Sequence, residues 1–130
     1  MNWLAIILAT IGQAVVGMVW YSKAGFAKQW MALAKITPSG TRKDAARAVA
    51  TSMVASLVSS IVLAVLFTAT GATTAAMGLQ IVGLVWLGFI VTTSLNHVLF
   101  EKYSFKLFLL HAAHNLVSLA VAGLILTAWH

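Results

Sequence analysis

The chain has 130 residues, of which 62% are hydrophobic and only 8% are charged. A water-soluble domain carries about 25% charged residues, so this chain has too few polar side chains to cover a soluble surface, whereas lipid tails can solvate the apolar excess. The sequence has no cysteine, which excludes disulfides and thiolate metal sites.

The apolar runs, taken in chain order, predict four membrane-spanning helices. The first run, residues 3–21, is expected to be retained and not cleaved as a signal peptide, because no Lys or Arg precedes it and it ends in Trp20 and Tyr21. Three further runs have the length of roughly 20 residues that a spanning helix needs, at residues 48–67, 78–100 and 105–129. We therefore expect a single all-α domain over residues 1–130, an integral membrane four-helix bundle.

The segment between the first two spans is too polar to cross a membrane. Phe26, Trp30 and Leu33 fall on one helical face, which predicts a short amphipathic helix lying on the membrane surface. An irregular loop is the alternative. Thr41, with Asp44 three residues later, resembles a capping box and predicts the start of the second spanning helix.

Positive charge is concentrated in one connection between the spans. Six of the eight Lys and Arg residues lie in the connection 22–47, residues 71–77 carry none, and Lys102 and Lys106 flank the third connection together with Glu101. Because cytoplasmic loops are enriched in Lys and Arg, we expect the first and third connections in the cytoplasm and both termini outside it. Since this pattern is a topology signal, we expect no nucleic-acid partner.

Small residues predict where the helices meet. Ser52, Ser56 and Ser60 recur every four residues on the second span, and Gly88 lies on the third. Small side chains let membrane helices approach closely, so a helix-packing seam is the first interpretation and a polar pathway along the serines is the alternative. Four short helices bury little interior, so we expect a homo-oligomer, a dimer by default, with membrane lipid as the other partner.

Polar side chains inside a bilayer are costly, so they mark candidate sites. At a helical rise of about 1.5 Å per residue, Gln13 lies near the midplane of the first span, and Ser59 and Ser60 are central in the second. His114 and Asn115 have a similar depth in the fourth span. The sequence therefore predicts one polar layer shared by these residues.

The fourth span carries a polar stripe. His111, His114, Asn115 and Ser118 share one helical face because they stand at i, i+3, i+4 and i+7. Hydrogen bonding between helices is one interpretation, and binding of a proton or substrate is another, since imidazole titrates near neutrality. Two histidines without a thiol or carboxylate nearby are a weak metal pattern, so we expect no metal and no cofactor.

No catalytic set stands out in the sequence. Asp44 and Glu101 are the only acidic side chains, and both are expected at helix ends. Glu101 follows His97 by one helical turn and is either a solvated charge of the hairpin or the start of a polar path towards His111. Phosphate-binding loops and nucleophile elbows are absent from the sequence, so we expect no enzyme.

Two stretches carry a family resemblance. The first is Val19–Ser22 followed by Phe26, Lys28 and Trp30, and the second runs from Trp86–Phe89 through Leu95, Asn96 and Leu99–Lys102 into the fourth span. Together they resemble the bacterial membrane family of domain of unknown function 1761.

The resemblance implies a four-span protein of the bacterial inner membrane and implies no activity. It indicates a shared role for Trp20, Tyr21, Ser22, Asn96 and Glu101. The chain departs from the family pattern in two places. Lys23 stands where proline is frequent, and His111, Ala113 and His114 stand where Asn, Gly and Tyr are frequent.

The composition and the polar layer favour a small transporter or channel-like protein that uses Gln13, His114 and Asn115. The alternative is a non-transporting structural or accessory protein that packs with a partner or with lipid. A membrane enzyme acting on a lipid or quinone is a third hypothesis, and the shortage of acidic residues makes it the weakest.

Overall fold

The computed structural model describes residues 2–22, 25–34, 42–100 and 104–129, with residues 27, 30, 33, 34 and 42–45 described by their backbone alone. Every element within these ranges is helical, which confirms the predicted all-α class. The elements are α1 (Trp3–Trp20), α2 (Ala27–Ala34), α3 (Arg42–Thr70), α4 (Ala75–Val85), the π-helix η1 (Trp86–Val91), α5 (Thr92–Phe100) and α6 (Phe105–Ala128).

Four of the described helical stretches are long and apolar enough to cross a membrane, which confirms the predicted four spans. They are Trp3–Trp20, Ala46–Thr70, Ala75–Phe100 and Phe105–Ala128. The second and third spans extend a few residues beyond the predicted limits. The reason is that the helices continue into residues that are less hydrophobic than the middle of each span. The short α2 forms within the segment where an amphipathic helix was expected. The chain is therefore a multi-pass membrane protein.

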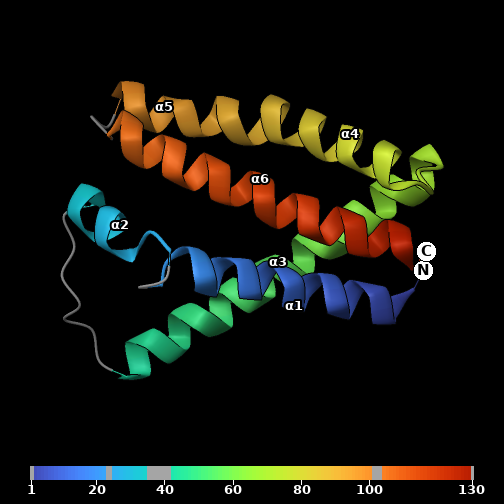
Figure 1. Ribbon diagram of the computed structural model, residues 1–130, viewed down its shortest axis with the longest axis horizontal. Coiled ribbons are helices and arrows are strands. Elements are labelled where there is room, and N and C mark those ends of the chain that lie inside the picture. The colour runs from blue at the N-terminus through green and yellow to red at the C-terminus, as the bar shows by residue number, and fades with distance from the viewer. Residues whose placement is uncertain (1, 23–24, 35–41, 101–103, 130) are drawn as a thin grey trace.

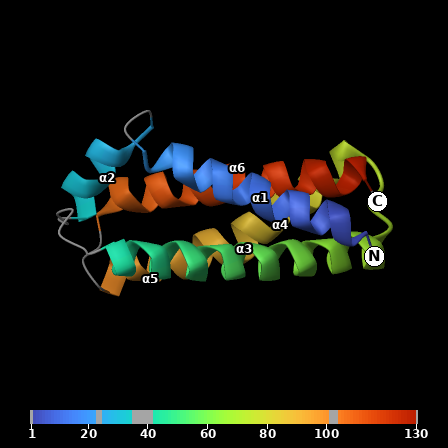
Figure 2. The same ribbon diagram turned by 90° about the horizontal axis from the view of Figure 1, so that it is seen from below.

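Helix α6 lies at the centre of the bundle. It packs against α1 on one side and α4 on the other, while α3 packs mainly against α1 (Figures 1 and 2). Figure 1 shows α3 crossing the bundle at an angle, so that its Arg42 end lies away from α5 and α6 while its Thr70 end lies near the start of α4. The two termini lie together at the opposite end from α2.

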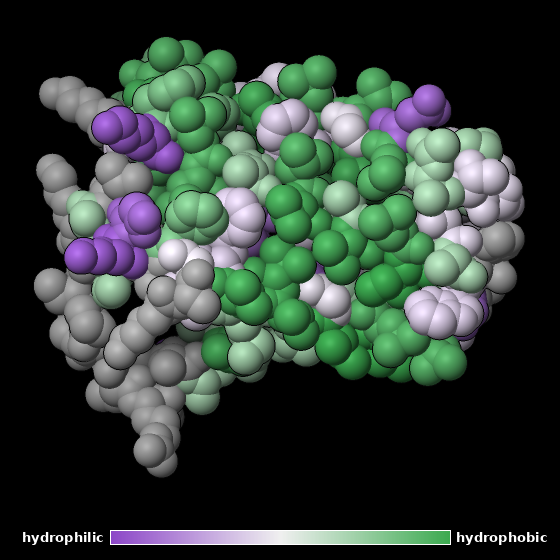
Figure 3. Space-filling view, in the orientation of Figure 1, coloured by the Kyte–Doolittle hydropathy of each residue, from purple (hydrophilic) through white to green (hydrophobic). Residues whose placement is uncertain are grey.

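The surface is most apolar in the middle of the bundle. Figure 3 shows a broad apolar band across the middle, hydrophilic residues at the end where α2 lies and a further hydrophilic group towards the other end. Lys28, Arg47 and Lys106, on α2 and at the starts of α3 and α6, belong to the end where α2 lies, which we call the cationic end. The end that holds Asn2 and Trp129 is the terminal end.

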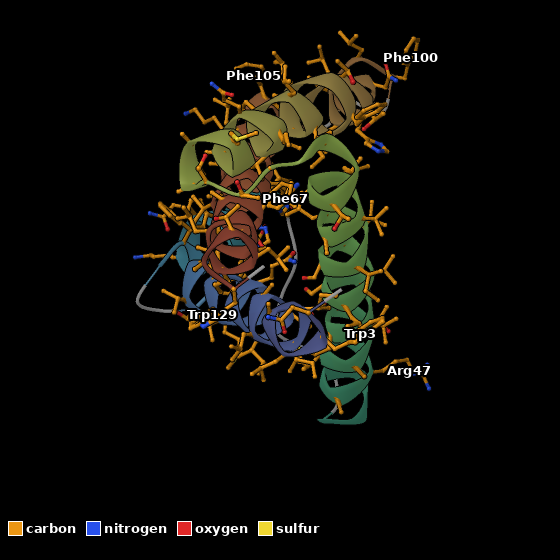
Figure 4. All side chains as sticks on the ribbon, turned by 90° about the vertical axis from the view of Figure 1, so that its right-hand side faces the viewer. Trp3, Arg47, Phe67, Phe100, Phe105 and Trp129 are labelled. Carbon is orange, nitrogen blue, oxygen red and sulfur yellow. The ribbon has the colours of Figure 1, made fainter. Side chains whose placement is uncertain are left out.

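The hydrophobic core lies in the half of the bundle next to the terminal end. Its centre is Phe67 of α3, which points into the space between α3, α4 and α6 (Figure 4). Glycines make room for this ring: a Cβ added to Gly78 would lie 2.7 Å from Cγ2 of Thr127 and 3.3 Å from Phe67, and one added to Gly123 would lie 3.1 Å from Val82. The helices therefore pack closely here.

Asn2 joins the two ends of the chain. Its Oδ1 accepts a hydrogen bond from the backbone N–H of Ala5 (3.2 Å), and its Nδ2 donates to the carbonyl of Trp129 (2.7 Å). One side chain thus caps the start of α1 and satisfies a carbonyl that the end of α6 leaves free.

The structure does not place Gly88 in a packing seam of the chain, in contrast to the sequence interpretation. A Cβ at Gly88 would meet no described atom within 4 Å. The reason is the π-helix: the wider turn of η1 changes which side chains face α6. Trp86 takes that position, and its indole N–H donates to the carbonyl of Ala112 (2.8 Å).

Candidate functional site

Gln13 of α1 is the centre of a hydrogen-bond network between three helices. Its Nε2 donates to Oγ of Ser60 (2.8 Å) and to the carbonyl of Ser56 (3.3 Å). Its Oε1 accepts from Oγ of Ser59 (3.1 Å) and Oγ of Ser118 (3.3 Å). Both donors and both lone pairs of the amide are used, so its burial is compensated. We call this set the Gln13 layer.

A groove of about 740 Å³ begins at the Gln13 layer and lies between α1, α3, α6 and η1. Its apolar wall includes Met18, Val49, Met53, Ile90 and Leu119. Hydrogen-bonding side chains from α1 and its C-cap, α3 and α6 also line it: Gln13, Tyr21, Ser52, Ser56, Ser59, His114, Asn115 and Ser118. The volume lies within the range of about 300–1,000 Å³ of small-molecule sites.

The groove extends from the middle of the membrane towards the cationic end. Tyr21 lies eight residues after Gln13 on α1, which at about 1.5 Å per residue corresponds to about 12 Å. Beyond Gln13, on the terminal side, Ile6 and Ala9 are fully buried in the core and close the space. On the other side α3 diverges from α5 and α6 (Figure 1), and the lining of the groove continues to Tyr21 and Ala48.

Aromatic and imidazole rings gather where α1 ends beside α6. The hydroxyl of Tyr21 is hydrogen-bonded to Nδ1 of His111 (2.5 Å). Its ring centroid is 5.1 Å from that of His114, and the Trp20 centroid is 6.1 Å from His114. Nε2 of His114 is buried without a hydrogen-bond partner in the described part of the chain, and so is Nε1 of Trp20.

The family comparison covers all four spans and the whole groove. The sequence model of a family described as protein of unknown function (DUF1761) matches residues 4–127. The chain belongs to the DUF1761 family. No curated protein and no solved structure matches the chain. The family description assigns no activity to this DUF1761 protein.

The structure brings part of the predicted site of this DUF1761 protein together. Gln13, His114 and Asn115 line the groove together with two of the three predicted α3 serines, Ser52 and Ser56. The third, Ser60, is fully buried and accepts a hydrogen bond from Gln13. Asn96 is exposed on α5 and does not line it.

Other predicted residues lie around the groove or outside the described part. Ser22 donates through Oγ to the carbonyl of Val19 (2.7 Å), which closes the last turn of α1. Trp30 lies on α2, but its side chain is outside the described part of the chain, as are Glu101, Thr41 and the Asp44 side chain of the predicted capping box. Among the residues that the structure describes, no group of three or more His, Asp or Glu is placed to hold a metal ion.

Gly17 is one of three groove residues of α1 that sequence reasoning missed, together with Ala14 and Met18. A Cβ at this position would lie 3.5 Å from Nε2 of His114, so the glycine lets the imidazole approach the backbone of α1. A signal was present in the sequence, because Gly17 stands one helical turn after Gln13 and one turn before Tyr21. The apolar wall residues on α3 and η1 carried no such signal, since they look like ordinary lipid-facing residues.

Proposed function

We propose that this DUF1761 protein is a small transport protein that binds a solute in the groove between α1, α3 and α6. The observation that carries the proposal is the convergence of hydrogen-bonding side chains from three helices at the depth of Gln13. Polar groups inside a bilayer are costly, so their concentration around an open space of this size supports a binding role.

The geometry supports a carrier better than a channel. Gln13 fills the middle of the bundle, and the core formed by residues such as Ile6, Leu63 and Ala122 lies behind it, so the described residues leave the groove accessible from one side. Release on the other side requires a movement of helices. The seam between α1 and α3 has small side chains, Ser60 and Ala64, along which α3 can change its tilt.

We infer the orientation from charge. The cationic end faces the cytoplasm by the positive-inside rule, so the groove opens towards the cytoplasmic half of the membrane. No catalytic role is proposed, because the side chains known to line the groove include no carboxylate.

Flux in proteoliposomes tests the proposal. The probes are glycerol, erythritol and urea, followed by stopped-flow light scattering, protons, followed by a trapped pH dye, and a fluorescent lipid with a neutral hydroxyl-bearing head, followed by the fraction accessible to an external quencher. We expect at least one probe to cross faster than in protein-free liposomes, and His114→Leu to lower that rate several-fold. His97→Leu is the matched control, since His97 is exposed on α5 and does not line the groove.

A structural or accessory role predicts the opposite outcome. Val49 and Met53 line the groove and are exposed on its membrane side, so a partner's side chains can occupy it. In that case none of the probes binds or crosses faster than in protein-free liposomes. A partner protein also co-purifies with the chain, and substitutions in the groove release it. That combination would overturn the transport proposal.

A further inference from the structure

We propose that the molecule bound in the groove is a neutral amphiphile, a lipid-soluble molecule with a hydroxyl, amide or carbonyl head, which enters sideways from the membrane. This inference rests on the proposed function and narrows it to one class of substrate. It follows from the charge of the groove, from its hydrogen-bonding groups and from the position of its apolar wall.

The charge of the groove selects against ions. Its described lining has amide, hydroxyl, phenol and imidazole groups and no Lys, Arg, Asp or Glu. Arg47 directly precedes the lining residue Ala48 on α3, but Figure 4 shows its side chain pointing away from the bundle. A charged head would therefore lose its hydration without gaining a counter-charge, which is strongly unfavourable at this depth.

The polar wall offers groups that suit a neutral head. The Ser52 hydroxyl lines the groove one turn from Ser56 and makes no hydrogen bond within the described part of the chain. Asn115 adds an amide on the opposite wall. Because a hydroxyl and an amide each donate and accept, they can bind an alcohol, an amide or a carbonyl without any change of protonation.

The apolar wall gives the tail a way in. Met18, Val49 and Met53 line the groove and are 71%, 60% and 36% exposed, so this side of the groove is continuous with the membrane-facing surface. Unbranched methionine side chains adapt to chains of different shape. A tail can thus remain among the lipids while the head lies against Ser52 and Asn115, so the molecule reaches the groove without passing through water.

Quenching of tryptophan fluorescence tests the head-group preference. The chain in nanodiscs is titrated with four brominated probes of one chain length that carry an alcohol, a primary amide, a carboxylate or a trimethylammonium head. Trp20, whose ring lies 6.1 Å from the groove residue His114, is the reporter. The chain has five tryptophans, so the difference between the native chain and Trp20→Phe gives the part of the quenching that comes from Trp20. Concentrations are expressed per membrane lipid, so that differences in partitioning do not count as binding.

We expect saturable quenching by the alcohol and amide probes, with at least tenfold weaker binding of the two charged probes. Ser52→Leu places a larger side chain in the groove, and we expect it to weaken binding of the alcohol probe at least tenfold. Thr51→Leu, at an exposed position of α3 outside the groove lining, is expected to leave binding unchanged.

The outcomes separate this inference from the proposed function. If a charged probe binds as tightly as the alcohol probe or more tightly, and Ser52→Leu abolishes that binding, the groove is a binding site but its ligand is not neutral. Displacement of the alcohol probe by glycerol would overturn entry from the lipid and indicate a water-soluble solute. Absence of saturable quenching by all four probes, together with absence of flux, would overturn both proposals.

Discussion

The two halves of this bundle are packed in different ways. In the half next to the terminal end, glycines admit the ring of Phe67, and buried, mostly apolar side chains pack around it. In the half next to the cationic end, α3 diverges from α6 and polar side chains line an open groove. Since lipid provides little hydrophobic drive between helices, close packing in one half has to hold the bundle together while the other half stays open. The three substitutions below are ordered by expected effect.

Gly78→Val tests whether the terminal half holds the fold. The new Cβ would lie 2.7 Å from Cγ2 of Thr127, whose hydroxyl is fixed by a hydrogen bond to the carbonyl of Gly123 (3.0 Å). Overpacking of this kind costs about 3 kcal/mol, and we expect it to appear in the free energy of unfolding measured by denaturant titration in detergent micelles. Gly83→Val on the same helix is the control, because a Cβ there meets no described atom within 4 Å. Equal losses in both variants would contradict the comparison.

Gln13→Leu tests the boundary between the two halves. Leucine has a similar volume but removes four hydrogen bonds to Ser56, Ser59, Ser60 and Ser118. At about 0.6 kcal/mol for each hydrogen bond inside a membrane, the same titration should show a loss of about 2 kcal/mol. Gln80→Leu, at an exposed position of α4, is the matched substitution and should change stability little. If Gln13→Leu is as stable as the native chain, the layer does not join the helices.

Asn2→Ala tests the cap at the terminal end. It removes the acceptor of the Ala5 N–H and the donor to the Trp129 carbonyl, at a cost of about 1 kcal/mol. Amide hydrogen exchange should accelerate in the first turn of α1 and the last turn of α6, and stay unchanged around the groove. Asn96→Ala on α5 is the control. Faster exchange near Gln13 would show that the two halves are not independent.

The sequence was sufficient for the spans and for the depth of Gln13 and its serine partners on α3, whereas His114 lies nearer the cationic end, beside Gly17 and Tyr21. Helix length and hydropathy decide which segments can cross a bilayer, and helical rise alone put Gln13 level with Ser59 and Ser60, which the structure shows bonded to it. These properties depend on one helix at a time, so a single sequence reveals them.

The groove and the position of Gly88 depend on relations between helices. The spacing of Gly88 is typical of a packing stripe, but Gly88 lies in the π-helix η1, which turns it away from α6. The hydropathy pattern of the sequence does not predict a π-helix. The angle at which α3 crosses the bundle likewise depends on its packing against α1. Val49 and Ile90 therefore looked lipid-facing in the sequence and proved to line the groove.

The hydrogen bond from Asn2 to the Trp129 carbonyl holds the start of α1 beside the end of α6. A short peptide bridge could connect the present ends, and a cut at the exposed Thr73, between α3 and α4, would then create new ones. The same proximity allows two copies to be joined in tandem as an eight-span chain. The architecture is thus open to circular permutation and to internal duplication.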